Sequence, residues 1–213
     1  MRFDPRSIKQ FLINVLIPNH HIPKTRWTAD GLWDLSFIRV LLLTIGLVLL
    51  GIGSSLTVQS GLGNAPWTVL AQGMSIQTGL ALGVSFFLVS LLVLLFWIPL
   101  SLKPGYGTIA NTVFFAFGLQ IGIEYIPEPS NLYLAYFLLI AGVWISGAGG
   151  ALYITCGLGT GPRDGIMLGF LGKSKLPITV VRALIEIVVL VLGYFLGGLV
   201  GIGTIIIALL IGR

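Results

Sequence analysis

Two glycine-rich hexapeptides, GLGNAP at residues 61–66 and GLGTGP at residues 157–162, lie 96 positions apart in the chain (157 minus 61). The same offset relates other glycines. Of the ten glycines in residues 40–117, eight fall on a glycine of residues 136–213. Chance placement would give about two such matches, so the agreement indicates a duplication. The sequence therefore predicts two copies of one structural unit.

Long apolar stretches surround both hexapeptides. The chain is 56% hydrophobic and only 9% charged, with a mean hydropathy of +1.02, whereas about a quarter of the residues in soluble domains are charged. We therefore expect an all-α polytopic membrane protein with about six spans, since a helix needs roughly 20 residues to cross a bilayer. The predicted spans are 39–60, 80–102, 106–123, 132–156, 176–198 and the shorter 199–213.

The repeat assigns three spans to each copy. We expect a single membrane domain in which an N-terminal cytoplasmic or interfacial segment, 1–38, precedes repeats at 39–124 and 132–213. Because three is odd, the second copy must enter the membrane in the opposite sense, which makes a 3+3 inverted-topology repeat. Such repeats are typical of secondary transporters, which expose a site to each side in turn. The alternative is that the symmetry serves only folding or assembly.

Basic residues predict the orientation of the spans. Lys and Arg precede the first span, follow the second, lie between the fourth and fifth, and end the chain, and such residues favour the cytoplasmic side. The opposite side receives loop 61–79 and the loop that carries Glu124 and Glu128. We therefore expect both termini in the cytoplasm. This pattern explains the net charge of +5, so we expect no nucleic-acid partner.

Each hexapeptide ends in a proline that begins an apolar stretch too short to span, about 66–77 and 162–172. Proline suits the first turn of a helix, and Asn64 or Thr160 can supply the cap. We expect two short helices that lie at the membrane or re-enter it, with N-termini that favour anions. The predicted substrate-binding or pathway residues are Gly61, Gly63, Asn64, Pro66, Trp67, Thr68, Gly157, Gly159, Thr160, Pro162, Arg163 and Asp164.

Charged residues distinguish the second copy from the first. Arg163 and Asp164 follow the second proline, and Arg182 and Glu186 share one face of the fifth span. An ionised Glu186 inside a membrane costs several kcal/mol unless it is paired, so we predict a network of these four residues. Either it is a neutralised clamp for the short helix, or an arginine attracts an anionic substrate while Glu186 or Asp164 carries a coupling proton. The matching positions of the first copy are Trp67, Thr68, Phe86 and Ser90.

The sequence offers few groups for catalysis or metal binding. Its one cysteine, Cys156, and its two histidines, His20 and His21, form no cluster with the spacing of metal ligands. No nucleophile motif or phosphate loop is present. We therefore expect no enzyme activity, no catalytic residue, no metal site and no cofactor.

Four short motifs lie on the two copies: GLGNAPW (61–67), PGYGT (104–108), GLGTGPRDG (157–165) and GIGT (201–204). Together with Arg182 and Glu186, they resemble the bacterial YczE/YyaS/YitT group of small integral membrane proteins. The resemblance covers about 39–213 and implies a multispan helical fold in the bacterial cytoplasmic (inner) membrane, but no particular substrate. That group usually has an aspartate where this chain has Thr68, which argues against a mechanism that needs two symmetric acids.

Two classes of function follow from these features. The first is a secondary transporter or facilitator of a small anionic or zwitterionic solute, and it predicts flux. The second is a non-transporting membrane scaffold or accessory subunit, and it predicts co-purification with a membrane partner. The oligomeric state stays open, because small-residue faces such as Gly142 with Ser146 suit contacts within one chain or in a homo-oligomer.

Overall fold

The computed structural model describes residues 24–174 and 176–211. This part of the chain is all-helical and has no strand, as its apolar pattern predicts. The greater part of the predicted interfacial segment 1–38 lies outside the described residues. The elements are α2 (Phe37–Gln59), α3 (Pro66–Thr78), α4 (Leu82–Leu95), α5 (Trp97–Leu100), α6 (Tyr106–Ala110), the π-helical turn η1 (Asn111–Phe115), α7 (Ala116–Tyr125), α8 (Leu132–Thr155), α9 (Pro162–Lys173), α10 (Ile178–Phe195) and α11 (Ile202–Ile211).

Several helices have the length and composition to cross a membrane. In the described residues there are five such stretches, and they correspond to the first five predicted spans. α11 contributes ten described residues, fewer than the roughly 20 that a span requires. The protein therefore has several membrane-spanning helices, and the described part accounts for five of the six predicted spans. The five stretches are Phe37–Gln59, Leu82–Leu100, Tyr106–Tyr125, Leu132–Thr155 and Ile178–Phe195.

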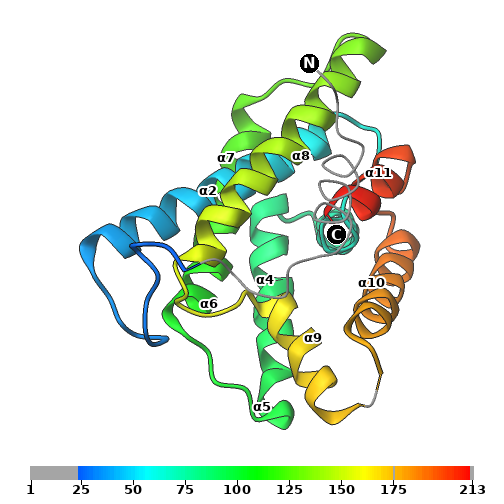
Figure 1. The fold of residues 1–213 in the computed structure, drawn as a ribbon. Helices are drawn as coiled ribbons and strands as arrows, with labels where there is room; N and C mark the ends of the chain where they lie inside the picture. Colours follow the sequence, from blue (N-terminus) through cyan, green and yellow to red (C-terminus); the bar gives the residue numbers. More distant parts are fainter. Residues whose placement is uncertain (1–23, 175, 212–213) are drawn as a thin grey trace, which may run out of the picture.

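α2 and α8 lie side by side along a seam of glycines (Figure 1). A Cβ added to Gly46 would lie 2.9 Å from the carbonyl oxygen of Gly149, and one added to Gly53 would lie 2.8 Å from that of Gly142. The residue number rises along α2 as it falls along α8, so the two helices are antiparallel. Glycines let helix backbones approach closely, which stabilises helix pairs in lipid through dispersion contacts.

The two short helices begin where the sequence predicts. α3 and α9 each start with the proline of their hexapeptide and run for 13 and 12 residues. The glycine loops before them have nearly the same backbone conformation, with positive φ angles that residues with a Cβ rarely adopt. These angles are 65° at Gly61, 111° at Gly63, 69° at Gly157 and 116° at Gly159.

The predicted caps of these helices are wrong. In both helices the N-cap is the residue directly before the proline, and no side chain caps either helix. The reason is that a residue before proline is held in an extended conformation, which shifts the cap one position beyond Asn64 and Thr160. The Asn64 amide instead donates to Gln72 Oε1 at 3.1 Å. The Thr160 carbonyl accepts a bond of 2.7 Å from the Thr108 hydroxyl.

Each glycine loop is held by a helix that starts in the other half of the chain. The Gly203 amide at the start of α11 donates to the Leu62 carbonyl at 2.7 Å, and the Gly107 amide in α6 donates to the Leu158 carbonyl at 2.8 Å. The two donors are 96 positions apart (203 minus 107), and so are the two acceptors (158 minus 62). The halves are therefore interlocked through equivalent bonds.

The short helices also pack on elements of the other half. α3 lies against α10, where a Cβ added to Gly193 would come within 2.5 Å of the Leu70 nitrogen. α9 lies against α4 and α5, which Figure 1 shows in yellow beside green. Because each short helix packs on the other half, the starts of both short helices lie in the interior between the two halves.

Candidate functional site

An ion pair lies at the middle of α10. Arg182 Nε donates to Glu186 Oε1 at 2.9 Å, one helical turn along. At 1.5 Å per residue, Glu186 is about 12 Å or more from either end of α10. The two side chains retain 38% and 28% of their exposure, so the pair borders open space instead of being enclosed by packed side chains. The pairing expected from the spacing of these residues is present.

Arg163 is held by aromatic rings. Its guanidinium lies 5.5 Å from the ring centre of Phe86 and 5.3 Å from that of Phe115, and these rings stack with centroids 4.3 Å apart. A cation at such distances is attracted to the faces of the rings. Within residues 24–174 and 176–211, the guanidinium makes no hydrogen bond and no ion pair. Its N–H groups are therefore available to a ligand.

The start of α9 is anchored on both sides of Arg163. The Trp97 indole N–H donates to the Pro162 carbonyl at 3.0 Å, and the Trp97 ring fills the space where Gly165 lacks a side chain. The Tyr153 hydroxyl donates to the Gly159 carbonyl at 3.1 Å. These contacts fix the backbone that carries Arg163 and thus place its side chain over the two rings.

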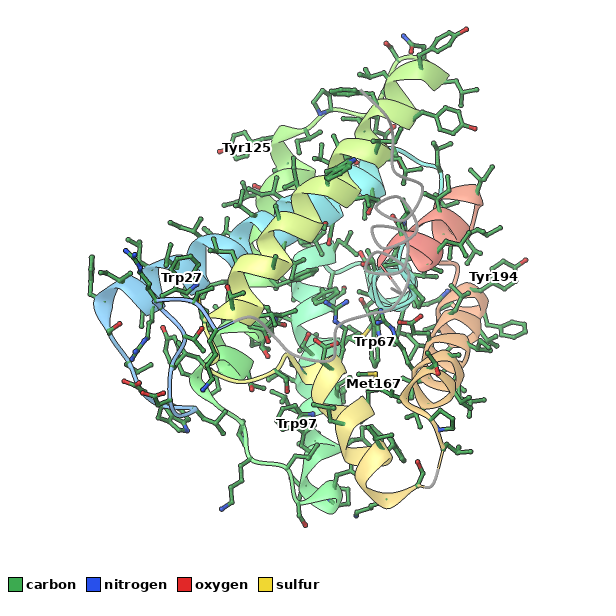
Figure 2. The ribbon with its side chains drawn as sticks, in the orientation of Figure 1. Trp27, Trp67, Trp97, Tyr125, Met167 and Tyr194 are labelled. Carbon is green, nitrogen blue, oxygen red and sulfur yellow. The ribbon has the colours of Figure 1, made fainter. Side chains whose placement is uncertain are left out.

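A polar cavity of about 330 Å³ brings the predicted charged residues together. Arg163, Asp164, Arg182 and Glu186 all line it, although within the described residues only Arg182 and Glu186 form an ion pair there. The four residues of the predicted network therefore share a cavity, but they do not form a closed set of bonds. The other lining side chains come from α2, α3, η1, α8, α9 and α10; Figure 2 shows Trp67 and Met167 among them.

A second cavity of about 120 Å³ adjoins the first. It is lined by α2, by the start of α3 and by Ile207 and Ala208 of α11. The two cavities share six lining residues, among them Arg163 of α9 and the Arg182–Glu186 pair of α10. The shared residues are Leu50, Trp67, Ser146, Arg163, Arg182 and Glu186.

The predicted pathway residues divide into two groups. The residues that follow the loop glycines reach the cavities: Pro66, Trp67, Thr68, Arg163 and Asp164. The others line neither cavity. They shape the loops by positive φ angles, by bonds to their carbonyls or, for Asn64, by a side-chain bond to Gln72: Gly61, Gly63, Asn64, Gly157, Gly159, Thr160 and Pro162. The loops therefore position the site more than they form its surface.

Sequence reasoning missed four residues of the site: Phe86, Asn111, Phe115 and Tyr153. Asn111 and Phe115 bound η1, a π-helical turn within the third span, and such turns are frequent at functional sites. Asn111 is one of two amide side chains inside the apolar third span, with Gln120, and such polar residues are a usable signal. Phe86 and Phe115 carry no such signal, because they are two of the chain's 12 phenylalanines.

The chemistry of the site is that of binding charged groups. Arginine N–H groups recognise carboxylates and phosphates, and the nearby carboxylates can accept a cation or a proton. In the part of the chain that the structure describes, no three His, Cys, Asp or Glu residues gather as metal ligands. Cys156 is buried.

Comparison with known proteins places the chain in a family. A family model described as a family of unknown function, DUF6198, matches residues 37–213. The chain is 45% identical over 191 residues to an uncharacterized protein of Haemophilus influenzae, covering 90% of this chain and 88% of that one. It is 29% identical to the uncharacterized membrane protein YczE of Bacillus subtilis, over 78% of this chain and 79% of YczE. It is 32% identical to YyaS of the same organism, over 76% and 83% of the two chains. No solved structure matches the chain. The chain therefore belongs to the DUF6198 family, and its similarity to YczE and YyaS confirms the resemblance that its motifs predict.

Proposed function

We propose that this protein is a secondary transporter or facilitator of a small anionic or zwitterionic solute. The observation that carries the proposal is the meeting of two cavities at one charged site. Trp67, Arg163, Arg182 and Glu186 line both. A charged site between the starts of two short helices, beside the middle of a spanning helix, is the arrangement that transporters with inverted repeats use.

The two cavities occupy equivalent places in the repeat. Several of their lining residues are related by the 96-residue offset: Thr57 with Tyr153, Ala65 with Gly161, Thr68 with Asp164, and Ile207 with Asn111. On this proposal the cavities are two halves of one pathway, and access alternates as one enlarges and the other shrinks. The cavities differ in volume, about 330 against 120 Å³.

The helix packing supports a 3+3 inverted repeat. The 96-residue offset exchanges the two glycine contacts of the antiparallel seam with each other, and it likewise exchanges the two bonds that hold the glycine loops. A two-fold axis in the membrane plane would require such an exchange. We propose that α11 begins the sixth span, that repeats 39–124 and 132–213 contribute three spans each, and that α3 and α9 re-enter the membrane from opposite sides. The segment 1–38 would then precede a single membrane domain.

We also propose a location in the bacterial cytoplasmic membrane with both termini in the cytoplasm. The distribution of basic residues favours this orientation. A contact supports it, because Lys173 Nζ at the end of α9 donates to the Pro99 carbonyl of α5 at 2.8 Å. The basic residues that follow α5 and end α9 would thus share one membrane face.

Ligand screening followed by flux measurement tests the transport proposal. Purified protein is screened for thermal stabilisation by small anions, amino acids and vitamins, and any ligand found is then offered to proteoliposomes. We expect Arg163→Gln to lower uptake strongly, because it removes a positive charge that faces both cavities and lies over the Phe86 and Phe115 rings. Glu124→Gln is the matched control, since Glu124 is exposed and bonds only Gln120 in the described chain. Absence of both a stabilising ligand and a flux would refute the proposal.

Glu186 is the proposed carrier of a coupling proton. Glu186→Gln keeps the size of the side chain but cannot be charged, so uptake should lose its dependence on a pH gradient. Uptake by this variant at the wild-type rate, with unchanged response to pH, would rule out the coupling role.

A membrane scaffold or accessory subunit is the second candidate function. The glycine-packed seam of α2 and α8 favours it, because such a solid interior suits a structural role. This function predicts co-purification with a membrane partner and no flux for any ligand that stabilises the protein. Neither candidate includes an enzyme activity.

A further inference from the structure

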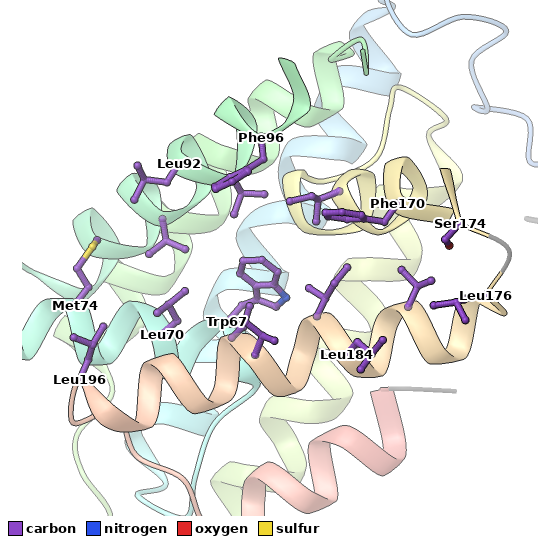
Figure 3. A pocket seen from close by; sticks show the side chains of 17 residues that line it. Trp67, Leu70, Met74, Leu92, Phe96, Phe170, Ser174, Leu176, Leu184 and Leu196 are labelled. Carbon is purple, nitrogen blue, oxygen red and sulfur yellow. The ribbon is translucent and has the colours of Figure 1, made fainter. Parts of the chain in front are cut away.

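A third cavity differs in character from the two at the charged site. It is an apolar groove of about 690 Å³ bounded by α3, α4, α9 and α10 (Figure 3). Apart from the Ser174 hydroxyl and the indole of Trp67, its lining consists of aliphatic, phenyl and thioether side chains. Leu92, Leu184 and Val188 line it while remaining more than half exposed. The groove therefore opens sideways, where lipid surrounds a spanning helix.

The groove lies on the boundary between the two halves. Its α4 and α10 walls are made of residues related by the repeat offset: Val89 with Ile185, Leu92 with Val188, and Val93 with Val189. Both halves therefore line the groove. The groove lies at the same interface between the halves as the charged site.

The apolar groove and the polar cavity meet. Trp67 lines the groove and both other cavities, and Ile185 lines the groove and the polar cavity. Figure 3 shows the Trp67 ring pointing into the groove between α3 and α10. On α10, Leu184 and Ile185 face the groove, while Glu186 faces the polar cavity. A ligand that passes Trp67 can therefore touch apolar and charged walls at once.

The polar cavity, which adjoins the groove, contains a positively charged side chain. Arg163 faces the polar cavity with its guanidinium over two rings, and within the described residues it has no hydrogen bond or ion pair. Its fork of N–H groups matches the two oxygens of a carboxylate. The groove supplies only dispersion and desolvation, which suit a hydrocarbon chain.

We propose that the ligand of this site is a single-chain amphipathic carboxylate, which enters from the bilayer through the groove. Its carboxylate binds Arg163 in the polar cavity, and its hydrocarbon chain lies in the groove beyond Trp67. This inference names the substrate class of the proposed transporter and so rests on the proposed function for its role, but binding is measurable without flux.

Photolabelling in nanodiscs tests the inference. The full-length protein is placed in phosphatidylcholine nanodiscs with a long-chain fatty acid that carries a diazirine at its tail end, or with the matching alcohol. After irradiation, labelled peptides are mapped by mass spectrometry. We expect labels on the walls of the groove, and roughly tenfold fewer with the alcohol or with Arg163→Gln, as for the loss of one charged hydrogen-bond partner.

Two tryptophan variants of α10 separate the groove from the general lipid surface. Leu184→Trp places a bulky ring at the wall of the groove and narrows it, whereas Ile187→Trp adds the same ring at a residue that is similarly exposed, 57% against 52%, but does not line the groove. Labelling should fall several-fold in the first variant only. Equal falls in both, labels spread evenly over the lipid-facing helices, or equal labelling by acid and alcohol would each overturn the inference. Disulfide cross-links between two copies of a Leu184→Cys variant would overturn it as well, since the occupant would then be a second chain.

The outcomes distinguish this inference from the transport proposal. If the groove is labelled specifically but the same acid shows no flux, the transport proposal is refuted and the binding site is still supported. If a hydrophilic solute shows flux and the groove is not labelled specifically, the transport proposal is still supported and the amphipathic substrate is refuted.

Discussion

Replacing Gly149 with alanine should destabilise the protein, whereas the same change at Gly147 should not. Both residues lie on α8, but two positions along a helix turn the side chain by about 200°. Gly149 therefore faces α2 across the seam, and a Cβ added to Gly147 would meet no atom within 4 Å. Comparing the two variants measures the cost of close backbone packing, because both carry the same Gly→Ala change on the same helix.

The size of the effect follows from the distances. A Cβ at Gly149 would lie 2.6 Å from both the Gly46 oxygen and the Leu50 nitrogen, about 1 Å closer than such atoms prefer. Overpacking of this kind costs about 1–3 kcal/mol, and the better helix propensity of alanine returns about 0.8–1 kcal/mol. At Gly147 only the propensity gain of about 0.8–1 kcal/mol remains. Because the propensity gain is common to both variants, they should differ by the overpacking cost alone, roughly 1–3 kcal/mol in the free energy of unfolding.

Thermal unfolding of the purified variants in one detergent measures this difference. For a chain of this length, 1 kcal/mol corresponds to about 2–4 °C, so the melting temperatures should differ by roughly 2–12 °C. Gly53→Ala is a second test, because its Cβ would come within 2.5 Å of the Ser146 nitrogen; it should behave like Gly149→Ala. Equal melting temperatures for Gly147→Ala and Gly149→Ala would refute the seam as a source of stability.

Three further predictions concern the anchoring of α9, the interior and the topology. Trp97→Phe keeps a ring against Gly165 but removes the bond to the Pro162 carbonyl, so it should lower the stability by about 1 kcal/mol in thermal unfolding; an unchanged melting temperature would contradict this. Cys156 is 0% exposed, so it should react with maleimide only after denaturation in SDS, and labelling of the folded protein would be inconsistent with the fold. Cysteines placed at Lys103 and Glu128 should be labelled by an impermeant reagent from opposite sides of the membrane; labelling of both from one side would contradict the proposed orientation.

Local sequence signals predicted the helices well. The apolar runs identified five spanning stretches because length and hydrophobicity are properties of a segment by itself. The two prolines marked the starts of α3 and α9 because a proline ring favours the first helical turn whatever surrounds it. The pairing of Arg182 with Glu186 was also predictable, since residues four apart on a helix are neighbours. The capping prediction failed because it ignored how a proline restricts the residue before it.

The sequence by itself predicts a duplication and places the four residues of the charged cluster, Arg163, Asp164, Arg182 and Glu186, in the second copy. Only the tertiary structure decided what those charges meet. Arg163 rests on Phe86 from α4 and Phe115 from η1, and each glycine loop is held by a helix from the other half. Such contacts join residues tens of positions apart, so no local period or spacing encodes them. They depend on the crossing of α2 and α8 and the interlocking of the two halves, and these in turn decide where the polar cavities and the apolar groove meet.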